Sequence, residues 1–445
     1  MFKNKKILIL GMARSGYQVA KLLSKYNNEI IITDKKEQDV SHIEELEELG
    51  VTFILSEDPI DLLDENFDLV IKNPGIRYDH PLIIKAEKLG IKVVNEVQVA
   101  YHFLPKNVGI IAVTGANGKT TTTTLCYEFL KEAGYPVHLG GNIGYPFSQI
   151  VEDVKENDIV VLEISAQQLH DCYDFNPTVS ILTNLTPVHI DFFGTYENYI
   201  DHKLRIFKNH NSKNIAIINK SNKDSYESTK NIKSKKIYFS SSEEADCFIK
   251  DESIYYNDEK IVELSDIRVK GMHNYENIMC AIIATKHFNI PTDAIKKVLD
   301  KFTGVEHRIE FVAKVNGREF YNDSKATNVK STQIALSAFN TPTILLLGGL
   351  DRGHSFDELK EYLKNTTHIV CYGETKERIK DFANKCNIDV TVVDTLEEAV
   401  NVAYNISNEG DTILLSPACA SWDQFDNFEV RGNEFKKVVN SLENK

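Results

Sequence analysis

Several features are scarce or absent in this chain of 445 residues, and each absence excludes a class of protein. The seven cysteines are an odd number and are scattered, with no Cys-x-x-Cys pair, so the sequence indicates neither a disulfide framework nor a zinc site, and a reducing compartment fits. No apolar run is long enough to cross a bilayer. The formal net charge of −14 argues against a nucleic-acid partner and an anionic membrane surface.

The remaining composition is that of an ordinary globular protein. Hydrophobic residues make up 42% of the chain and charged residues 26%, which is enough to build several cores. The length predicts about three domains. The first residues imitate a signal peptide, but the apolar run Lys5–Leu10 is too short and we interpret it as a strand. We expect a cytoplasmic protein without membrane insertion.

A phosphate-binding unit is the clearest pattern in the sequence. The apolar run Val108–Val113 predicts a buried strand, Thr114–Gly118 breaks it, and Lys119 opens a helix that Gly134 ends. Backbone amides and the positive end of a helix dipole bind an anion at such a turn. Lys119 adds a cation for the β- and γ-phosphates, and the Thr120 hydroxyl can bind Mg²⁺. We therefore predict a nucleoside triphosphate site, with a chance Gly-Lys-Thr as the alternative.

The first hundred residues predict a small α/β domain with a glycine turn. A strand at Ile7–Leu10 leads into the turn Gly11–Gly16, and a second strand, Ile30–Thr33, ends at Asp34. The pattern is similar to the dinucleotide-binding fingerprint, with Ala13 in place of the middle glycine. Such spacing suits any diphosphate, that of a UDP-sugar included.

Two more buried strands follow the phosphate loop, and both end in polar residues. Ile159–Ile164 and Val179–Leu182 are apolar without alternation, as expected when both faces of a parallel sheet are covered. Ligands bind at the carboxyl ends of such strands. Glu163 stands there, where a buried carboxylate needs a partner or a metal ion. It is a candidate Mg²⁺ ligand, and a glutamate that accepts helix amides is the alternative.

Short-range signals predict further local structure. Ser41-x-x-Glu44 predicts a capping box, and Asn316-Gly317 predicts a hairpin turn near the start of a third unit. Beyond it, apolar strands alternate with helices such as Leu396–Ile406, which predicts a second doubly wound fold.

A series of longer motifs runs through the chain in a fixed order. It comprises T-G-x-N-G-K-T, a glutamate at the next strand end, N-L-x-P-x-H-x-D with His189, and E-N-Y-x-x-x-K with Lys203. The runs 271–277, 306–308 and 322–328 follow, so that the motifs extend from about residue 11 to 434. Together they resemble the Mur ligases, ATP-dependent enzymes that form amide bonds in bacterial cell-wall synthesis.

Three stretches resemble the branch of this family that adds D-glutamate. They are N-D-S-K-A-T-N, the glycine turn Gly348–Gly353, and Leu415–Phe425 together with Phe428-Glu-x-Arg431-Gly432. The D-N-P-R run of the branch that adds diaminopimelate or lysine is absent from the sequence.

The resemblance implies an ATP-dependent ligase that joins D-glutamate to UDP-N-acetylmuramoyl-L-alanine through an acyl phosphate. It implies an α/β fold of three domains: a Rossmann-like domain for the UDP substrate at 1–100, a central P-loop ATPase-like parallel sheet at 101–302, and a C-terminal Rossmann-like domain at 303–445. The last would bind the incoming amino acid and close over ATP. We expect a monomer.

The resemblance also implies roles for individual residues. Catalytic roles are expected of Lys119, His189 and Lys203. Two Mg²⁺ ions are expected, held by Thr120, Glu163, His189 and a carbamylated Lys203. ATP contacts are expected of Gly115, Asn117, Gly118, Lys119, Thr120, Thr121, Asn277, Arg308 and Asp323. Substrate contacts are expected of Ser15, Asp34, Gly75, Asn142, Ser165, His189, Lys325, Thr327, Arg352, Ser421 and Phe428.

The sequence departs from the family pattern at three places. Val188 stands where many relatives carry Asp, and Ala166-Gln167 replaces the usual Ser-Phe. Arg352 stands where some members carry Lys; it can clamp a carboxylate with two hydrogen bonds, although the two residues are not interchangeable. We keep three alternatives: a related ligase with another amino acid or a folate-like acceptor, an NAD-dependent dehydrogenase, and an inactive nucleotide-binding regulator.

Overall fold

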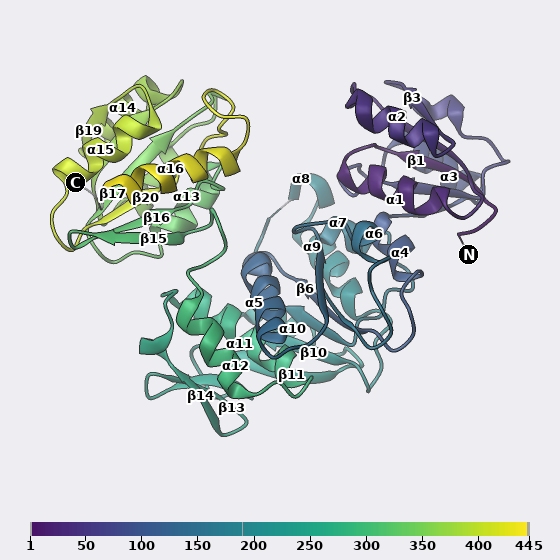
Figure 1. Cartoon of the computed structure of the whole chain (residues 1–445), viewed down its shortest axis with the longest axis horizontal. Helices are drawn as coiled ribbons and strands as arrows, with labels where there is room; N and C mark the ends of the chain where they lie inside the picture. Colours follow the sequence, from purple (N-terminus) through teal and green to yellow (C-terminus); the bar gives the residue numbers. More distant parts are fainter. Residues whose placement is uncertain (1, 189, 443–445) are drawn as a thin grey trace. The chain divides into compact units, whose positions relative to one another are not determined.

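The chain folds into three open β-sheets with helices packed against them (Figure 1). This computed structural model describes residues 2–188 and 190–442, except for the side chain of Asp191. The chain divides into two compact units, one up to Ile267 together with Met272–Asp300 and one from Lys301 onward together with Arg268–Gly271. In these described ranges, no helix combines the length and apolar character needed to cross a membrane.

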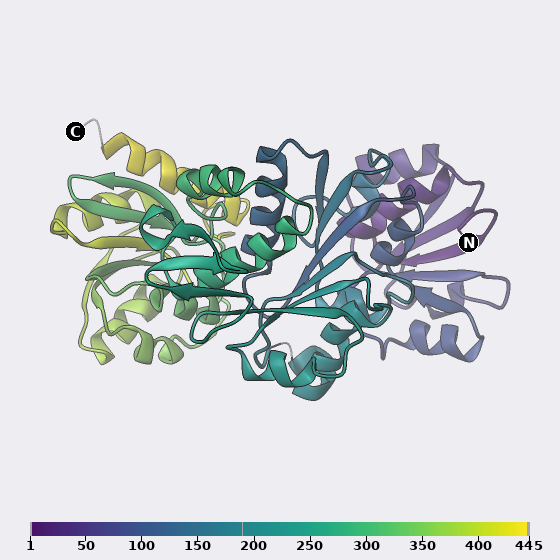
Figure 2. The ribbon, with the colours of Figure 1, turned by 90° about the horizontal axis from the view of Figure 1, so that it is seen from below.

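The N-terminal sheet is wholly parallel, with strand order β3-β2-β1-β4-β5, and its purple strands run side by side in Figure 2. Its strands are β1 Lys6–Leu10, β2 Glu29–Asp34, β3 Val51–Leu55, β4 Leu69–Lys72 and β5 Lys92–Val94. The connecting helices are α1 Arg14–Ser24, α2 Val40–Glu48, η1 Pro59–Leu62, α3 Pro81–Lys88 and α4 Glu96–Tyr101. The order places the strand reversal beside β1, which is where open parallel sheets bind ligands.

Two local features of this sheet test the sequence analysis. The predicted glycine turn is confirmed as a tight approach of α1 to β1: a side chain at Gly16 would meet the Gly11 carbonyl oxygen at 1.9 Å. The capping box at Ser41 is wrong. The α2 helix begins two residues earlier than predicted, because the carboxylate of Asp39 accepts a hydrogen bond from the Ser41 amide at 2.9 Å and caps the helix itself.

The central sheet has the order β14-β13-β12-β11-β10-β9-β6-β8-β7 and is parallel except for the β12-β13-β14 meander. Its strands are β6 Gly109–Thr114, β7 Val137–Gly141, β8 Ile159–Glu163, β9 Val179–Leu182, β10 Ile215–Asn219, β11 Lys235–Ser240, β12 Cys247–Lys250, β13 Ser253–Tyr256 and β14 Glu259–Glu263. Every residue of β8, β9 and β10 is buried, which explains the lack of alternation in the sequence.

Helices cover both faces of the central sheet. They are α5 Lys119–Glu132, α6 Phe147–Ile150, α7 Ala166–His170, α8 Ile190–Phe193, α9 Tyr196–Leu204, η2 Arg205–Phe207, α10 Lys223–Ser228, η3 Leu264–Asp266, α11 Met272–Lys286 and α12 Thr292–Lys301. The α5 and α11 helices pack side by side (Figure 1). This contact brings a residue of the distant α11 helix to the start of α5.

The sheet of the second unit has the order β15-β16-β20-β17-β18-β19, with only the β15-β16 pair antiparallel. The predicted hairpin at Asn316-Gly317 is confirmed. Its strands are β15 Glu310–Val315, β16 Arg318–Asn322, β17 Thr343–Gly348, β18 Thr366–Tyr372, β19 Asp389–Val392 and β20 Thr412–Leu415. The helices are α13 Val329–Leu336, η4 Asp357–Tyr362, α14 Lys376–Lys385, α15 Leu396–Ile406 and α16 Phe428–Leu442.

Candidate active site

The phosphate loop leaves the central strand β6 and enters α5 at Gly118. Gly118 has a left-handed φ of +79° and is the N-terminal cap of the helix without a capping side chain. No side chain caps the first amides of α5, which is the arrangement of other anion-binding helix starts. Lys119 folds back over the loop, and its Nζ donates to the carbonyls of Gly115 (3.0 Å) and Ala116 (2.9 Å).

The neighbouring strand β9 holds this loop in place. The Thr183 hydroxyl donates to the Asn117 carbonyl at 2.6 Å, and the Asn184 side-chain oxygen accepts from the Asn117 amide at 2.9 Å. Gly115 has a φ of +148°, and a side chain there would meet the Thr183 hydroxyl at 1.8 Å. The loop conformation therefore requires glycine at this position.

Glu163 ends β8 and lies buried at the same edge of the sheet, 3% exposed. One carboxylate oxygen accepts from the Asn142 side-chain amide at 2.8 Å, and the Asn142 backbone amide donates to the Glu163 carbonyl at 2.8 Å. The other oxygen, Oε2, is buried without a hydrogen-bond partner among the described residues. A buried carboxylate oxygen left without a donor is an open ligand position for a cation.

Lys203, on α9, is one of the most deeply buried side chains of the chain, 2% exposed. Its Nζ donates to the Thr114 hydroxyl at 3.3 Å and lies 4.9 Å from the centre of the Tyr199 ring. Burial, together with repulsion from Lys119, lowers the pKa of Lys203 well below its usual value despite the attraction of Glu163. The amine at this position is thereby shifted toward its neutral, nucleophilic form.

The described residues offer a partial coordination sphere for Mg²⁺. Thr120, at the start of α5, and Glu163 supply a hydroxyl and a carboxylate, and both are buried. No cluster of three His, Cys, Asp or Glu side chains suited to a metal is found outside the undescribed positions. Mg²⁺ commonly binds through one or two carboxylates with waters and substrate phosphates, so the unpartnered Glu163 oxygen beside a phosphate loop fits this ion.

Other residues that were predicted to bind ligands lie around this edge of the central sheet or outside the described residues. Asn277 of α11 approaches the loop: its side-chain oxygen accepts from the Thr122 hydroxyl at 3.4 Å. Thr121 is buried in the first turn of α5. Ser165 caps α7 in a capping box with Gln168. His189 lies outside the described residues.

The N-terminal sheet carries a cavity of about 660 Å³ at the carboxyl ends of β1, β2 and β4. Asp34 and Gly75 line it together with Lys36 and Arg77, and the Asp34 carboxylate accepts from the Met12 amide at 2.8 Å. Two cations beside a backbone turn suit a diphosphate. The predicted placement of a diphosphate near Asp34 is consistent with this lining.

A second cavity, of about 350 Å³, lies between the N-terminal and central sheets. Ser15, Gly75 and Asn142 line it, and so do Glu96 and Gln168. Residues of two separate domains that were predicted to contact the substrate therefore line the same cavity. Asn142 also contacts Glu163, so this cavity shares a lining residue with the edge of the sheet that holds the phosphate loop.

The second unit brings Asp323 and Arg308 into electrostatic contact. Asp323 is buried and its carboxylate accepts from the Ser416 hydroxyl (2.7 Å) and the Ile309 amide (3.2 Å). Burial raises the pKa of Asp323 to about 7, although the Ser416 hydrogen bond and the charges of Arg308 and Arg431 act in the opposite direction.

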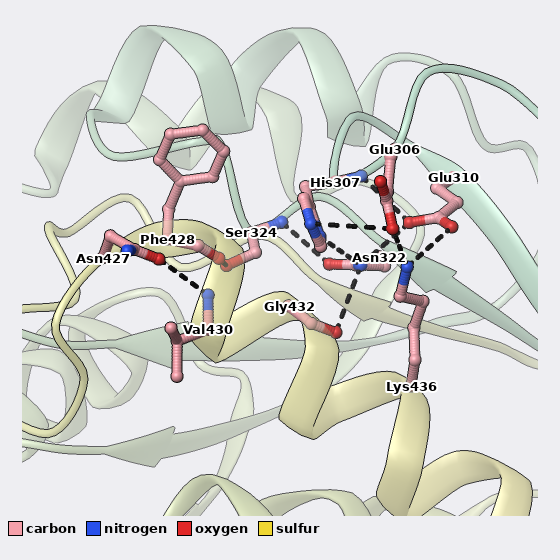
Figure 3. Close-up of polar contacts among 10 residues, drawn as sticks. All are labelled: Glu306, His307, Glu310, Asn322, Ser324, Asn427, Phe428, Val430, Gly432 and Lys436. Atoms are coloured by element: carbon pink, nitrogen blue, oxygen red, sulfur yellow. Dashed lines mark hydrogen bonds and ion pairs between the residues drawn. The ribbon is translucent and has the colours of Figure 1, made fainter.

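A polar cluster, buried at Asn322 and His307 and exposed at Glu306, supports the next segment (Figure 3). The Asn322 side-chain amide lies 3.0 Å from His307 Nδ1 and donates to Glu310 at 3.0 Å. Lys436 of α16 pairs with Glu306 and Glu310. The cluster ties β15, β16 and α16 together just before Asp323.

The residues predicted to bind D-glutamate come from three segments of the second unit. The Lys325 Nζ lies 5.6 Å from the Phe428 ring centre, and the Thr327 amide donates to the Lys325 carbonyl at 2.9 Å. Arg352 is exposed and stacks on Trp422, with 4.8 Å from guanidinium carbon to ring centre. Ser421 is buried next to this pair.

Arg431, which has no role predicted from the sequence, organises these segments. It is wholly buried and donates to the Ser324 hydroxyl (3.0 Å), the Ser324 carbonyl (2.8 Å) and the Cys419 carbonyl (3.0 Å). Tyr199 stood in the motif E-N-Y-x-x-x-K without a role of its own, and its position four residues before Lys203 places both residues on one helix face.

Comparison with known proteins bears directly on this arrangement. Family models match residues 5–95 (Mur ligase MurD-like, N-terminal domain), 113–285 (Mur ligase middle domain) and 307–419 (Mur ligase, glutamate ligase domain). UDP-N-acetylmuramoylalanine–D-glutamate ligases of Bacillus cereus and Bacillus anthracis are 44% and 43% identical over 99% of this chain and 98% of their own length. The chain belongs to the Mur ligase family.

Solved structures agree with the fold of this Mur ligase. The UDP-N-acetylmuramate–alanine ligase of Thermotoga maritima aligns with a TM-score of 0.61 at 19% identity, covering 98% of this chain and 99% of its own. The MurF ligase of the same organism aligns with a TM-score of 0.58 at 17% identity, covering 99% and 96%. The predicted α/β fold of three domains is confirmed, whereas the predicted domain boundaries and site residues stay proposals.

Glu96, in the cavity between the two sheets of this Mur ligase, generates a prediction about pH. It is 2% exposed and accepts a hydrogen bond from the Ser148 amide, and burial raises its pKa to about 7. The folded state therefore holds this proton more tightly than the unfolded state. The stability that results is complete below about pH 4.5 and is lost as the pH rises through about 7, by up to about 3 kcal/mol.

Glu96→Gln should remove this part of the pH dependence. The difference in melting temperature between the wild type and the variant should shrink, or reverse in favour of the variant, between pH 5 and pH 8. Glu152→Gln, at a surface carboxylate paired with Lys25, is the matched control and should show no such trend. A difference for Glu96→Gln that stays constant across this range would contradict the prediction.

Proposed function

We propose that this Mur ligase joins the amine of D-glutamate to the carboxylate of UDP-N-acetylmuramoyl-L-alanine, with ATP as the second substrate, in peptidoglycan precursor synthesis. The whole-chain identity of 43–44% to named D-glutamate ligases carries the proposal. Phosphoryl transfer from ATP would convert the carboxylate into an acyl phosphate. Attack by the amine would then form the amide and release phosphate.

The phosphate loop of the chain supports the first of these steps. The amides at the start of α5 and the Lys119 ammonium would bind the β- and γ-phosphates, and Asn277, beside the loop, would contact the rest of ATP. Thr120 and the unpartnered oxygen of Glu163 would hold Mg²⁺. When bound, this ion offsets the negative charge that phosphate and carboxylate oxygens bring together.

For Lys203 we propose carbamylation and a second Mg²⁺ site shared with His189. A neutral amine adds to CO₂ and releases one proton, which leaves an anionic oxygen ligand in place of a cation. The buried position of Lys203 beside Thr114 supports this exchange, because a cation there lacks the solvation that it has in water. The carbamate would add a pair of oxygen ligands at the edge of the central sheet that holds Glu163.

Each of the two units would supply the pocket for one of the substrates that are joined. The N-terminal cavity at Asp34 and Gly75 would hold the UDP part, with Ser15, Asn142 and Ser165 toward the muramoyl part. In the second unit Arg308 and Asp323 would contact ATP. Lys325, Thr327, Arg352, Ser421 and Phe428 would frame D-glutamate, whose two carboxylates suit cations and hydroxyls. We propose a cytoplasmic location, which the seven free cysteines support.

The experiment that tests the reaction is phosphate release with ATP, Mg²⁺ and UDP-N-acetylmuramoyl-L-alanine against single amino acids of both hands. Release with D-glutamate alone is the expected result. Release with another amino acid would keep the mechanism and overturn the assignment of the D-glutamate pocket. No release with any amino acid would overturn the proposed acceptor.

Removal of the Lys203 amine should lower kcat by about 10²-fold or more, because a charged group close to the transferring phosphoryl group is lost. A short carboxylate such as formate should restore part of the Lys203→Ala activity, since it supplies the missing oxygen ligand. Lys208→Ala, at an exposed lysine after the same helix, is the control. Undiminished turnover of Lys203→Ala would remove Lys203 from the metal site.

Truncation of Arg352 should act on one substrate. Arg352→Ala is expected to raise the KM for D-glutamate about tenfold or more, as expected for the loss of a charge-assisted hydrogen bond, and to leave the KM for ATP within twofold. Lys437→Ala, at an exposed lysine of α16, serves as the control. Equal rises in both KM values would move Arg352 out of the amino-acid pocket.

A further inference from the structure

A buried ion pair joins the N-terminal sheet to the layer of helices on the central sheet. Lys72, the last residue of β4, lies 2.9 Å through its Nζ from Oδ2 of Asp171, which directly follows α7. The two side chains are only 1% and 3% exposed. Burial alone would raise the pKa of Asp171, but the contacts with His170 and Lys72 hold it below its ordinary value.

On the N-terminal side, Lys72 braces the turn that lines both cavities. Its Nζ also donates to the Ile76 carbonyl at 2.8 Å, across the turn Asn73–Ile76. Within that turn the Asn73 side chain accepts from the Gly75 amide at 3.0 Å and donates to the Ser15 hydroxyl at 3.1 Å. One ammonium therefore sets the position of the turn against the glycine turn of β1.

On the central side, the ion pair continues into the helix that carries Lys203. Oδ1 of Asp171 lies 2.6 Å from Nδ1 of His170, and the His170 carbonyl accepts from Arg205. The His170 ring stacks between two others: Tyr78, just beyond the turn, at 5.4 Å, and His202 of α9 at 4.8 Å. His202 is the residue before Lys203.

Buried charges are retained at a desolvation cost, and a packed apolar contact could join two domains without it. What this ion pair adds is a fixed position at both partners, since Lys72 also donates to the Ile76 carbonyl and Asp171 also contacts His170. Through these contacts the ion pair links the turn Asn73–Ile76, beside the proposed UDP pocket, with the helix that carries Lys203. The substrate must reach from the one to the other. We propose that Lys72 and Asp171 are positioning residues that set the distance from the UDP pocket to the reacting carboxylate.

This inference rests on the proposed placement of UDP in the N-terminal cavity. A substrate anchored by UDP at one end and reacting at the other loses rate when the two ends shift relative to each other. A misplacement of about 1 Å can lower the rate about 10²-fold. The ion pair would therefore affect turnover of the UDP substrate without touching any substrate atom.

The test uses single variants and an apolar double variant of the full chain. Lys72→Met should raise the KM for UDP-N-acetylmuramoyl-L-alanine about tenfold, because the turn Asn73–Ile76 loses its brace, and should also weaken UDP binding measured by calorimetry. Asp171→Asn keeps the Lys72 contact with Ile76 and should lower kcat by about tenfold with UDP affinity within twofold. The KM for ATP should stay within twofold in both variants.

The double variant separates positioning from stability. K72M/D171L places apolar side chains at both positions, so neither charge is left buried and unpaired, and it should melt near the wild type. Its turnover of the UDP substrate should nevertheless be impaired about tenfold or more. Glu152→Gln, which breaks the exposed pair between Lys25 and Glu152 across the same two sheets at 2.6 Å, should leave every constant unchanged.

Several outcomes would overturn the proposal. One is a double variant with wild-type kcat and KM, which would make the pair a structural brace only. Another is an equal loss for ATP and for the UDP substrate. Wild-type enzyme that ligates D-glutamate but does not bind UDP would overturn both the pocket assignment and this inference, whereas UDP binding together with unaffected kinetics in the variants would overturn the inference alone.

Discussion

The candidate site depends on the closeness of two strand ends. The Thr183 hydroxyl, at the end of β9, occupies the space that a side chain at position 115 would need. The same hydroxyl donates to Asn117 and so fixes the turn from which α5 starts. Since β9 pairs with β6 along its length, the phosphate loop takes its shape from the sheet register and not from its own sequence alone.

Around this loop the protein concentrates charge where water is excluded. Glu163 presents a carboxylate oxygen that no group in the described part of the chain hydrogen-bonds, and Lys203 is held in a place that disfavours a cation. Each is unfavourable in isolation, and under the proposed function each would become favourable through its ligand, Mg²⁺ at Glu163 and carbamylation at Lys203. This pattern is typical of sites whose electrostatics are completed by their ligands.

Much of the fold was predictable because its signals are local. Asn316 and Gly317 both take positive φ values, which asparagine and glycine tolerate better than other residues. These two residues were therefore enough to predict the hairpin. The capping box at Ser41 failed because Asp39 offered a better capping carboxylate two residues earlier. The burial of Lys203 could not be predicted from its helix, because nothing in that segment shows that the Thr114 hydroxyl, 89 positions away, lies 3.3 Å from its Nζ. The local sequence also gives no signal for the ion pair of Lys72 with Asp171, because only the packing of the N-terminal sheet against the helices of the central sheet brings the two residues together.

The free cysteines of the sequence acquire a further meaning from where they lie. Six of the seven are buried, and burial raises the pKa of each of their thiols, to about 11 for Cys371 and Cys419. A protonated, enclosed thiol does not react with alkylating reagents or oxidants until the structure around it opens. Because these thiols are divided between the part of the chain around the central sheet and the second unit, their labelling rates report the opening of each region separately. The native chain thus carries its own set of probes for local unfolding.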